Sequence, residues 1–267
     1  MRATCPSALE LELYMLLGTR RGVGLLVLIT VGSAAVAAPV SGQGSWETTL
    51  QPRDFNGDQV VDAYFDTDLD ITWLADASPM PFSYWHAANQ WATGLSVGEI
   101  ADWRLPKVAP INGTNFQFDW RCDGTSDLGA ADSSGWGLAS ELGHMYYATL
   151  GNKGQCAPGT KYEEQPGWGL KNTAMFDGLE ADGYWTGTVT GVLDTMRWTF
   201  GMSNGIQYPY RIEQLPAYAW AVHDGDVFPA LVPEPNSSLL ALIALAGLGF
   251  VGQSRVDCRT CRPMSGL

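Results

Sequence analysis

The chain has 267 residues, of which 46% are hydrophobic, enough apolar material to bury a core and to exclude a disordered or fibrous protein. Its 28 acidic and 15 basic residues give a formal net charge of −13, and residues 38–232 alone hold 24 acidic and 9 basic residues, or −15. Phosphate backbones repel a domain of this charge, so we do not expect nucleic acid as a partner.

The N-terminal segment has the features of an export signal. Arg20 and Arg21 precede an apolar run over residues 23–36, and small residues follow at the spacing that signal peptidase requires. We therefore expect residues 1–37 to be a secretory signal peptide that is cleaved beside Ala37 or Ala38.

An acidic pattern similar to a calcium loop precedes the first predicted strands. Oxygen-bearing side chains occupy positions 1, 3, 5 and 9 of that pattern: Asp54, Asn56, Asp58 and Asp62. Position 6 is Gln59 instead of glycine, and position 12 is Phe65 instead of glutamate. Two interpretations remain, a Ca²⁺ site and a solvated acidic turn, and the incomplete match favours the turn. No other cofactor is expected.

Two short helices are predicted in the central region. Residues 83–95 form the first, with Ser83 as its cap, and one face of it is apolar: Trp85, Ala88, Ala92 and Leu95. Residues 139–150 form the second, which Gly151 and Asn152 terminate.

Alternating apolar residues predict strands on both sides of these helices. The strands are expected at residues 63–66, 69–74, 183–188, 196–202 and 218–223. This order indicates a single loop-rich α+β domain in which the N-terminal and C-terminal strands are well placed to pair. Most of the 11 tryptophans are expected in its core.

The central domain contains two of the five cysteines, Cys122 and Cys156. In an exported domain such a pair predicts a disulfide, which would close the 33-residue glycine-rich stretch between them.

Two groups of residues are candidates for chemistry. Glu141 and His144 are three residues apart in the second predicted helix, as metal ligands or an acid and base pair would be, although a lone helical histidine more often has a structural role. Arg104 follows Asp102 and Trp103; it could clamp a carboxylate or sulfate, but a local ion pair with Asp102, with Trp103 in the core, is favoured.

The C-terminal region has three features in a fixed order. Val232, Pro233, Glu234 and Pro235 precede the apolar residues 239–251, and Arg255 follows. This order resembles the PEP-CTERM sorting signal, which an exosortase recognises. The resemblance implies that residues 232–256 are a sorting signal with a transmembrane helix and that residues 257–267 are a cytoplasmic tail.

The central domain carries a second resemblance. Its most specific element is Asp102-Trp103-Arg104-Leu105-Pro106 followed, after a variable loop, by Tyr184-Trp185-Thr186-Gly187-Thr188. Over residues 46–228 the chain resembles the C-terminal domain of the Lcl family of collagen-like adhesins. That family is similar to C-type lectin-like folds and, more distantly, to formylglycine-generating enzymes. The resemblance implies a C-type lectin-like fold. The formylglycine-generating chemistry of the distant relatives depends on paired active-site cysteines, and it does not carry over because Cys122 and Cys156 lie in the variable loop.

Lectin-like folds display their ligand contacts on a loop that corresponds here to residues 112–137. The candidate ligand-binding residues are Trp120, Arg121, Asp123, Asp127, Asp132 and Trp136. The expected function is therefore that of a non-enzymatic, exported protein of the cell surface or of a biofilm matrix that binds an exopolysaccharide or another surface macromolecule. It would be anchored in the inner membrane before exosortase processing. The alternatives are an exported metal-dependent enzyme that uses Glu141 and His144, and a purely structural matrix component.

Overall fold

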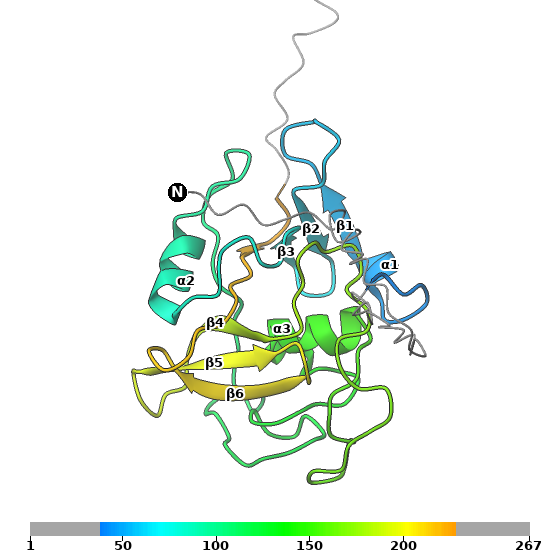
Figure 1. Cartoon of the computed structure of the whole chain (residues 1–267), viewed down its shortest axis with the longest axis vertical. Coiled ribbons are helices and arrows are strands. Elements are labelled where there is room, and N and C mark those ends of the chain that lie inside the picture. Colours follow the sequence, from blue (N-terminus) through cyan, green and yellow to red (C-terminus); the bar gives the residue numbers. More distant parts are fainter. Residues whose placement is uncertain (1–37, 228–267) are drawn as a thin grey trace, which may run out of the picture. The chain divides into compact units, whose positions relative to one another are not determined.

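A computed structural model describes residues 38–227 of the chain (Figure 1). The predicted signal peptide, transmembrane helix and cytoplasmic tail lie outside these residues. Between residues 38 and 227 there is no helix with the length and apolarity needed to cross a membrane.

The first sheet has four antiparallel strands and joins the two ends of the described region. Helix α1 (Trp46–Thr49) leads into β1 (Leu50–Arg53), followed by β2 (Ala63–Asp66) and β3 (Ile71–Leu74); the last strand is β7 (Val222–Asp224). The order is β1-β2-β3-β7, with Ile71 opposite Asp224. The predicted pairing of N-terminal and C-terminal strands is confirmed.

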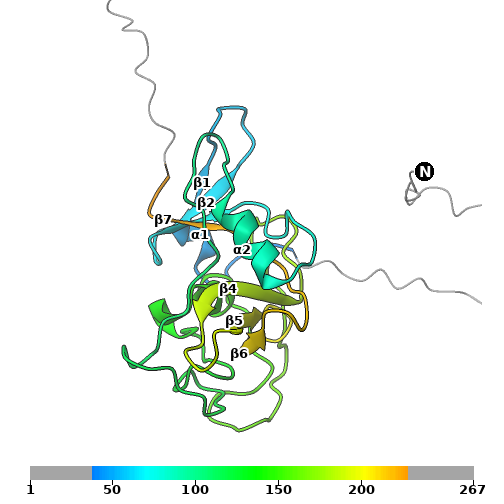
Figure 2. The ribbon, with the colours of Figure 1, turned by 90° about the vertical axis from the view of Figure 1, so that its left-hand side faces the viewer.

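The second sheet is an antiparallel meander of β4 (Gly183–Val189), β5 (Met196–Gly201) and β6 (Ile206–Arg211). Figure 2 shows it as a layer separate from the first sheet. The alternation of apolar residues in the sequence did not predict β1 or β6. Both are edge strands, and each contains a proline, Pro52 in β1 and Pro209 in β6. Proline cannot donate a ladder hydrogen bond, so it is tolerated at an edge and weakens the sequence signal for a strand.

The first predicted helix is confirmed as α2 (Trp85–Thr93), which buries Trp85, Ala88 and Ala92. The Trp85 indole nitrogen donates to the Thr186 carbonyl at 2.9 Å and so anchors the helix on β4. The predicted cap is wrong, because Tyr84 occupies the cap position without a side-chain hydrogen bond. The Ser83 hydroxyl donates instead to the carbonyl of Pro81 at 2.6 Å.

The second predicted helix consists of three short pieces. A 3-10 turn η1 (Gly137–Ala139) precedes α3 (Glu141–His144), and a π-helical turn η2 (Met145–Thr149) follows. The Ser140 hydroxyl accepts from Gly143 N at 3.0 Å and donates to Gln207 Oε1 at 2.7 Å, which ties the start of α3 to β6. Gly151, at φ 66°, ends the helical segment as predicted.

Aromatic side chains fill the core beneath the first sheet. Trp220 packs against Trp73 and Phe176, with ring centroids 4.5 and 4.7 Å away, and its indole nitrogen donates to the Leu74 carbonyl at 2.8 Å. Five tryptophans are almost fully buried: Trp73, Trp103, Trp185, Trp198 and Trp220. The domain is therefore a loop-rich α+β unit with two antiparallel sheets and few short helices.

Replacing Trp220 with alanine should lower the free energy of unfolding by about 3–5 kcal/mol, because it leaves a cavity and an unpaired Leu74 carbonyl. Chemical denaturation followed by fluorescence measures this change. The matched control is Leu138→Ala, a large apolar residue that is 72% exposed and should change stability by less than about 0.5 kcal/mol. Equal effects of the two substitutions would contradict the assignment of Trp220 to the core.

Candidate functional site

A disulfide joins the two long irregular segments of the domain. Cys122 and Cys156 are bonded, with their Cα atoms 5.8 Å apart, so the predicted pairing is confirmed. Both cysteines are buried and pack against Ala130. A buried structural disulfide indicates that the domain resides in an oxidising environment.

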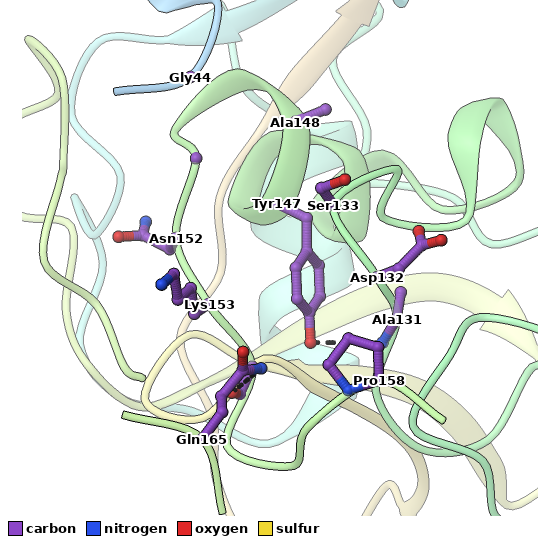
Figure 3. Close-up of a pocket in the computed structure, with 12 residues that line it drawn as sticks. Gly44, Ala131, Asp132, Ser133, Tyr147, Ala148, Asn152, Lys153, Pro158 and Gln165 are labelled. Atoms are coloured by element: carbon purple, nitrogen blue, oxygen red, sulfur yellow. Dashed lines mark hydrogen bonds between the residues drawn. The ribbon is translucent and has the colours of Figure 1, made fainter. Parts of the chain in front are cut away.

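A cavity of about 490 Å³ lies beside these segments (Figure 3). We call it the loop cavity. Residues 131–133 come from the loop before Cys156, Tyr147 and Ala148 come from η2, and residues 151–154 follow the helix. Pro158 and Gln165 from the segment after Cys156 complete the rim. The disulfide therefore fixes two of the walls relative to each other.

Polar side chains of both charge signs line the loop cavity. Figure 3 shows Asp132 and Lys153 on either side of the Tyr147 ring. Asp132 Oδ1 accepts from the Ser134 backbone at 2.8 Å, whereas no described residue donates to Oδ2. Lys153 is exposed, and its ammonium has no acidic partner among residues 38–227. These groups are available to hydrogen-bond a polar ligand.

Tyr147 forms a rigid wall of the loop cavity. Its hydroxyl donates to the Gly205 carbonyl at 2.7 Å and accepts from Ala131 N at 3.4 Å. Burial raises the pKa of Tyr147 far above its usual range, so the phenol stays neutral. The ring thus orders the loop of Ala131 and does not supply an acid or a base.

The predicted ligand-binding residues divide into two groups. Asp132 lines the loop cavity, and Arg121 is exposed. Trp120 is half-buried; its indole nitrogen donates to the Lys161 carbonyl at 2.9 Å, and its ring stacks on Tyr162 at 5.8 Å between centroids. Asp123 accepts from the Thr125 hydroxyl at 2.6 Å and remains near the surface.

The other two predicted contacts are buried and unavailable to a ligand. Asp127 is 0% exposed, and its carboxylate accepts from Ile111 N at 2.9 Å and Gln117 N at 2.7 Å. Trp136 is also buried, and its indole nitrogen donates to the Ser126 carbonyl at 2.7 Å. Both side chains hold the variable loop together, because buried backbone donors and acceptors need partners.

The acidic loop before β2 uses its side chains on its own backbone. Asp54 accepts from Gly57 N and Gln59 N at 2.7 and 2.8 Å, and Asp62 accepts from Phe55 N at 2.7 Å. Asn56 and Asp58 are hydrogen-bonded to each other at 3.1 Å. Such bonds are typical of an acidic turn.

The calcium interpretation of this loop stays a prediction. In the described part of the chain, no three His, Cys, Asp or Glu side chains are arranged to hold a metal ion.

Arg104 pairs with residues remote in the sequence. Its guanidinium donates two hydrogen bonds to Glu141, at 2.7 and 2.8 Å, and also contacts Asp224 through Nε at 2.9 Å and through Nη2. The expected pair with Asp102 is therefore wrong, whereas the expected burial of Trp103 is confirmed. The hydrogen bond from Arg104 lowers the pKa of Asp224.

Glu141 and His144 make no hydrogen bond to each other in the described part of the chain. Both Glu141 oxygens are held by Arg104, and Oε2 also accepts from Lys107 N at 2.6 Å. His144 is 9% exposed, and neither ring nitrogen has a hydrogen-bond partner among the described residues. Its Nε2 lies 3.9 Å from Oδ2 of Asp68, in the turn between β2 and β3.

Comparisons with known proteins add no assignment to this geometry. No family model, curated protein or solved structure matches the chain.

Replacing Arg104 with methionine should destabilise the domain by about 3–5 kcal/mol, because it leaves the buried Glu141 carboxylate without a positively charged partner. The double substitution Arg104→Met with Glu141→Leu should regain part of this loss, since it removes both charges. Urea denaturation measures these changes, with the exposed Arg211→Met as the control. An Arg104→Met protein as stable as the control would contradict the role of this ion pair.

Asp66→Asn should stabilise the domain at pH 7. Burial raises the pKa of Asp66 above its ordinary value of 3.8, although the Asp68 N–H and the charge of His144 oppose the shift. The protonated Asp66 carboxyl contributes favourably to the free energy of unfolding. This contribution is fully present below pH 3.8 and is lost as the pH rises through the raised pKa of Asp66 in the folded protein. The advantage of asparagine should therefore shrink as the pH falls toward 4.

Denaturation at pH 7 and at about pH 4 compares Asp66→Asn with the exposed Asp70→Asn. An Asp66→Asn advantage that grows on acidification would show that the ionised carboxylate stabilises the fold.

Proposed function

We propose that the chain is an exported protein of the cell surface or extracellular matrix whose domain binds a glycan in the loop cavity and catalyses no reaction. The observation that carries this proposal is the juxtaposition, beside a disulfide, of a carboxylate, an ammonium and a hydroxyl from Asp132, Lys153 and Ser133 around about 490 Å³. A neutral polyol can donate to the first group and accept from the second.

The chemistry of the loop cavity supports a neutral glycan over a charged ligand. A strongly anionic ligand would meet a domain with 24 acidic and 9 basic residues, and a cation would meet Lys153. The exposed ring of Tyr162, stacked with Trp120, is carried by the same disulfide-linked segments. Exposed aromatic rings offer an apolar face with a polar edge, as sugar rings require.

The enzyme alternative has less support. Glu141 already binds Arg104 and the Lys107 N–H, so a metal or substrate would have to displace a partly buried ion pair. The purely structural alternative is distinguished only by the absence of ligand binding.

The proposal includes a C-type lectin-like fold and PEP-CTERM sorting. Two antiparallel sheets, long irregular segments and a disulfide between them support the fold. The Val232 to Pro235 motif and the apolar run after it support exosortase processing and a final location at the surface or in the matrix.

Fractionation of cells that produce the tagged protein tests the export proposal. We expect the chain to lose residues 1–37 and to reach the surface or medium, and replacement of Pro233 and Glu234 by alanine to leave an unprocessed form in the inner membrane. Full-length protein in the cytosol would contradict export.

A glycan array with the exported protein, followed by titration of any hit, tests the binding proposal. Asp132→Asn and Lys153→Met should each weaken binding about tenfold or more, because hydrogen bonds to charged groups contribute about 1.5–3 kcal/mol. The matched controls are Asp119→Asn and Lys171→Met, both exposed and outside the loop cavity. Equal losses in the controls would contradict the site.

Two other outcomes of the same work would favour the alternatives. Stoichiometric metal that is lost in His144→Ala would favour an enzyme. No glycan binding and no bound metal would favour a structural matrix component.

A further inference from the structure

A second cavity, separate from the loop cavity, has aromatic walls. Its volume is about 290 Å³, and it lies between one face of the β4-β5-β6 sheet and the segments that precede α2 and β7. We call it the aromatic pocket, and its principal lining residues are Phe82, Asp182, Tyr208, Tyr210, Leu215 and Pro216.

Strand β6 supplies two adjacent walls. Tyr208 and Tyr210 are two residues apart, so their side chains lie on the same face of the sheet. Their ring centroids are 5.4 Å apart and the ring planes meet at 79°, which makes a corner instead of a flat platform. Thr199, opposite Tyr208 on β5, lies at the base, and its hydroxyl already donates to the Tyr208 carbonyl at 2.8 Å.

Backbone hydrogen bonds hold the opposite side of the aromatic pocket in place. Ser83 and Ala217 exchange two hydrogen bonds of 3.0 Å, and Tyr218 N donates to the Gly183 carbonyl at 2.9 Å. The Phe82 ring contacts Tyr218 at 4.9 Å between centroids. The aromatic pocket therefore exists before any ligand arrives.

Large apolar side chains remain exposed at the mouth of the aromatic pocket. Phe82 is 42% exposed and Leu215 is 52% exposed, although both lie beside a cavity. An apolar ligand surface would bury them, and each would then contribute hydrophobic free energy to binding.

The charge of the aromatic pocket is negative. Asp182 lines it, and no Lys or Arg does. Burial raises the pKa of Tyr208, and the neighbouring Tyr210 and Asp182 raise it further. The guanidinium of Arg197, on the strand next to β6, lies instead over the Trp85 ring, 4.0 Å from its centroid. A cation would therefore meet a carboxylate and electron-rich rings.

We propose that the aromatic pocket binds a quaternary ammonium group, such as the trimethylammonium headgroup of a choline-containing molecule. Aromatic faces attract a cation that has no N–H to satisfy, and a corner of rings surrounds it better than a single flat ring. The volume suits a headgroup, since small-molecule sites begin at about 300 Å³.

Calorimetric titration of the exported protein compares choline with 3,3-dimethylbutan-1-ol, which has the same shape and no charge. We expect choline to bind about tenfold more tightly or better, a difference of about 1.4 kcal/mol. Equal affinity would show only an apolar pocket, and no binding of choline would also overturn the proposal. Titration with phosphocholine distinguishes free choline from a phosphate-bearing choline headgroup as the ligand. If the phosphate lies near the mouth of the aromatic pocket, the negative charge of Asp182 should make phosphocholine bind more weakly than choline.

Variants test the geometry of the aromatic pocket. Tyr210→Leu and Asp182→Asn should each weaken choline binding about tenfold and leave the neutral analogue nearly unchanged. A Cβ added at Gly183 would lie 3.5 Å from the Tyr208 hydroxyl and 3.9 Å from Ala217, so Gly183→Ala should fold and should obstruct the base of the pocket. Loss of choline affinity in Gly183→Ala with unchanged circular dichroism supports the site.

Two controls separate this proposal from others. Tyr162→Leu removes an exposed ring outside the aromatic pocket and should not change choline binding. Asp132→Asn, in the loop cavity, should leave choline binding intact even if it abolishes glycan binding. Equal losses in Tyr162→Leu and Tyr210→Leu would overturn the assignment to the aromatic pocket.

Discussion

The half-buried guanidinium of Arg104 joins three parts of the domain that are far apart in the sequence. Its side chain binds Glu141 at the start of α3 and Asp224 in β7, and its backbone exchanges two 2.8 Å hydrogen bonds with Val222. The segment of Arg104 thereby extends the first sheet beyond β7 and connects it to the helix. Because Arg104 keeps its charge, separating it from Glu141 would leave two unpaired charges that are partly removed from solvent.

The helix that Glu141 anchors leads directly to the loop cavity. The η2 turn places Tyr147 against Ala131 and Gly205, and Asn152 follows with its side-chain oxygen accepting from Lys171 N and Asn172 N, both at 2.9 Å. The irregular segments on either side of Cys122 and Cys156 are thus held by side-chain hydrogen bonds and a disulfide in place of a sheet. Segments ordered in this way present backbone and side-chain polar groups to solvent, which suits recognition of a polar ligand.

The two cavities differ in chemistry because irregular segments line one and a β-strand lines the other. The loop cavity is lined by irregular segments that carry Asp132, Ser133 and Lys153, whereas the aromatic pocket uses the regular alternation of Tyr208 and Tyr210 on a strand. The loop cavity offers both hydrogen-bond donors and hydrogen-bond acceptors to a polyol. The second offers ring faces and one carboxylate, which favour a cation without hydrogen-bond donors. If both proposals hold, the protein recognises two chemically distinct ligands.

The sequence by itself determined those features that depend on neighbouring residues. Alternation predicted β2 and β3, helical spacing predicted the buried face of α2, and Gly151 marked the end of the second helical segment. The cysteine pair was predictable because only Cys122 and Cys156 lie between the two proposed sorting signals.

Tertiary structure decided the features that depend on contacts between distant residues. The edge strands β1 and β6, the partners of Arg104 and the burial of Asp127 and Trp136 all arise from such contacts. Both cavities do as well, since each is enclosed by segments remote in sequence. The physical reason is that local periodicity fixes the direction of a side chain relative to its own backbone, whereas the packing of remote segments determines what that side chain meets.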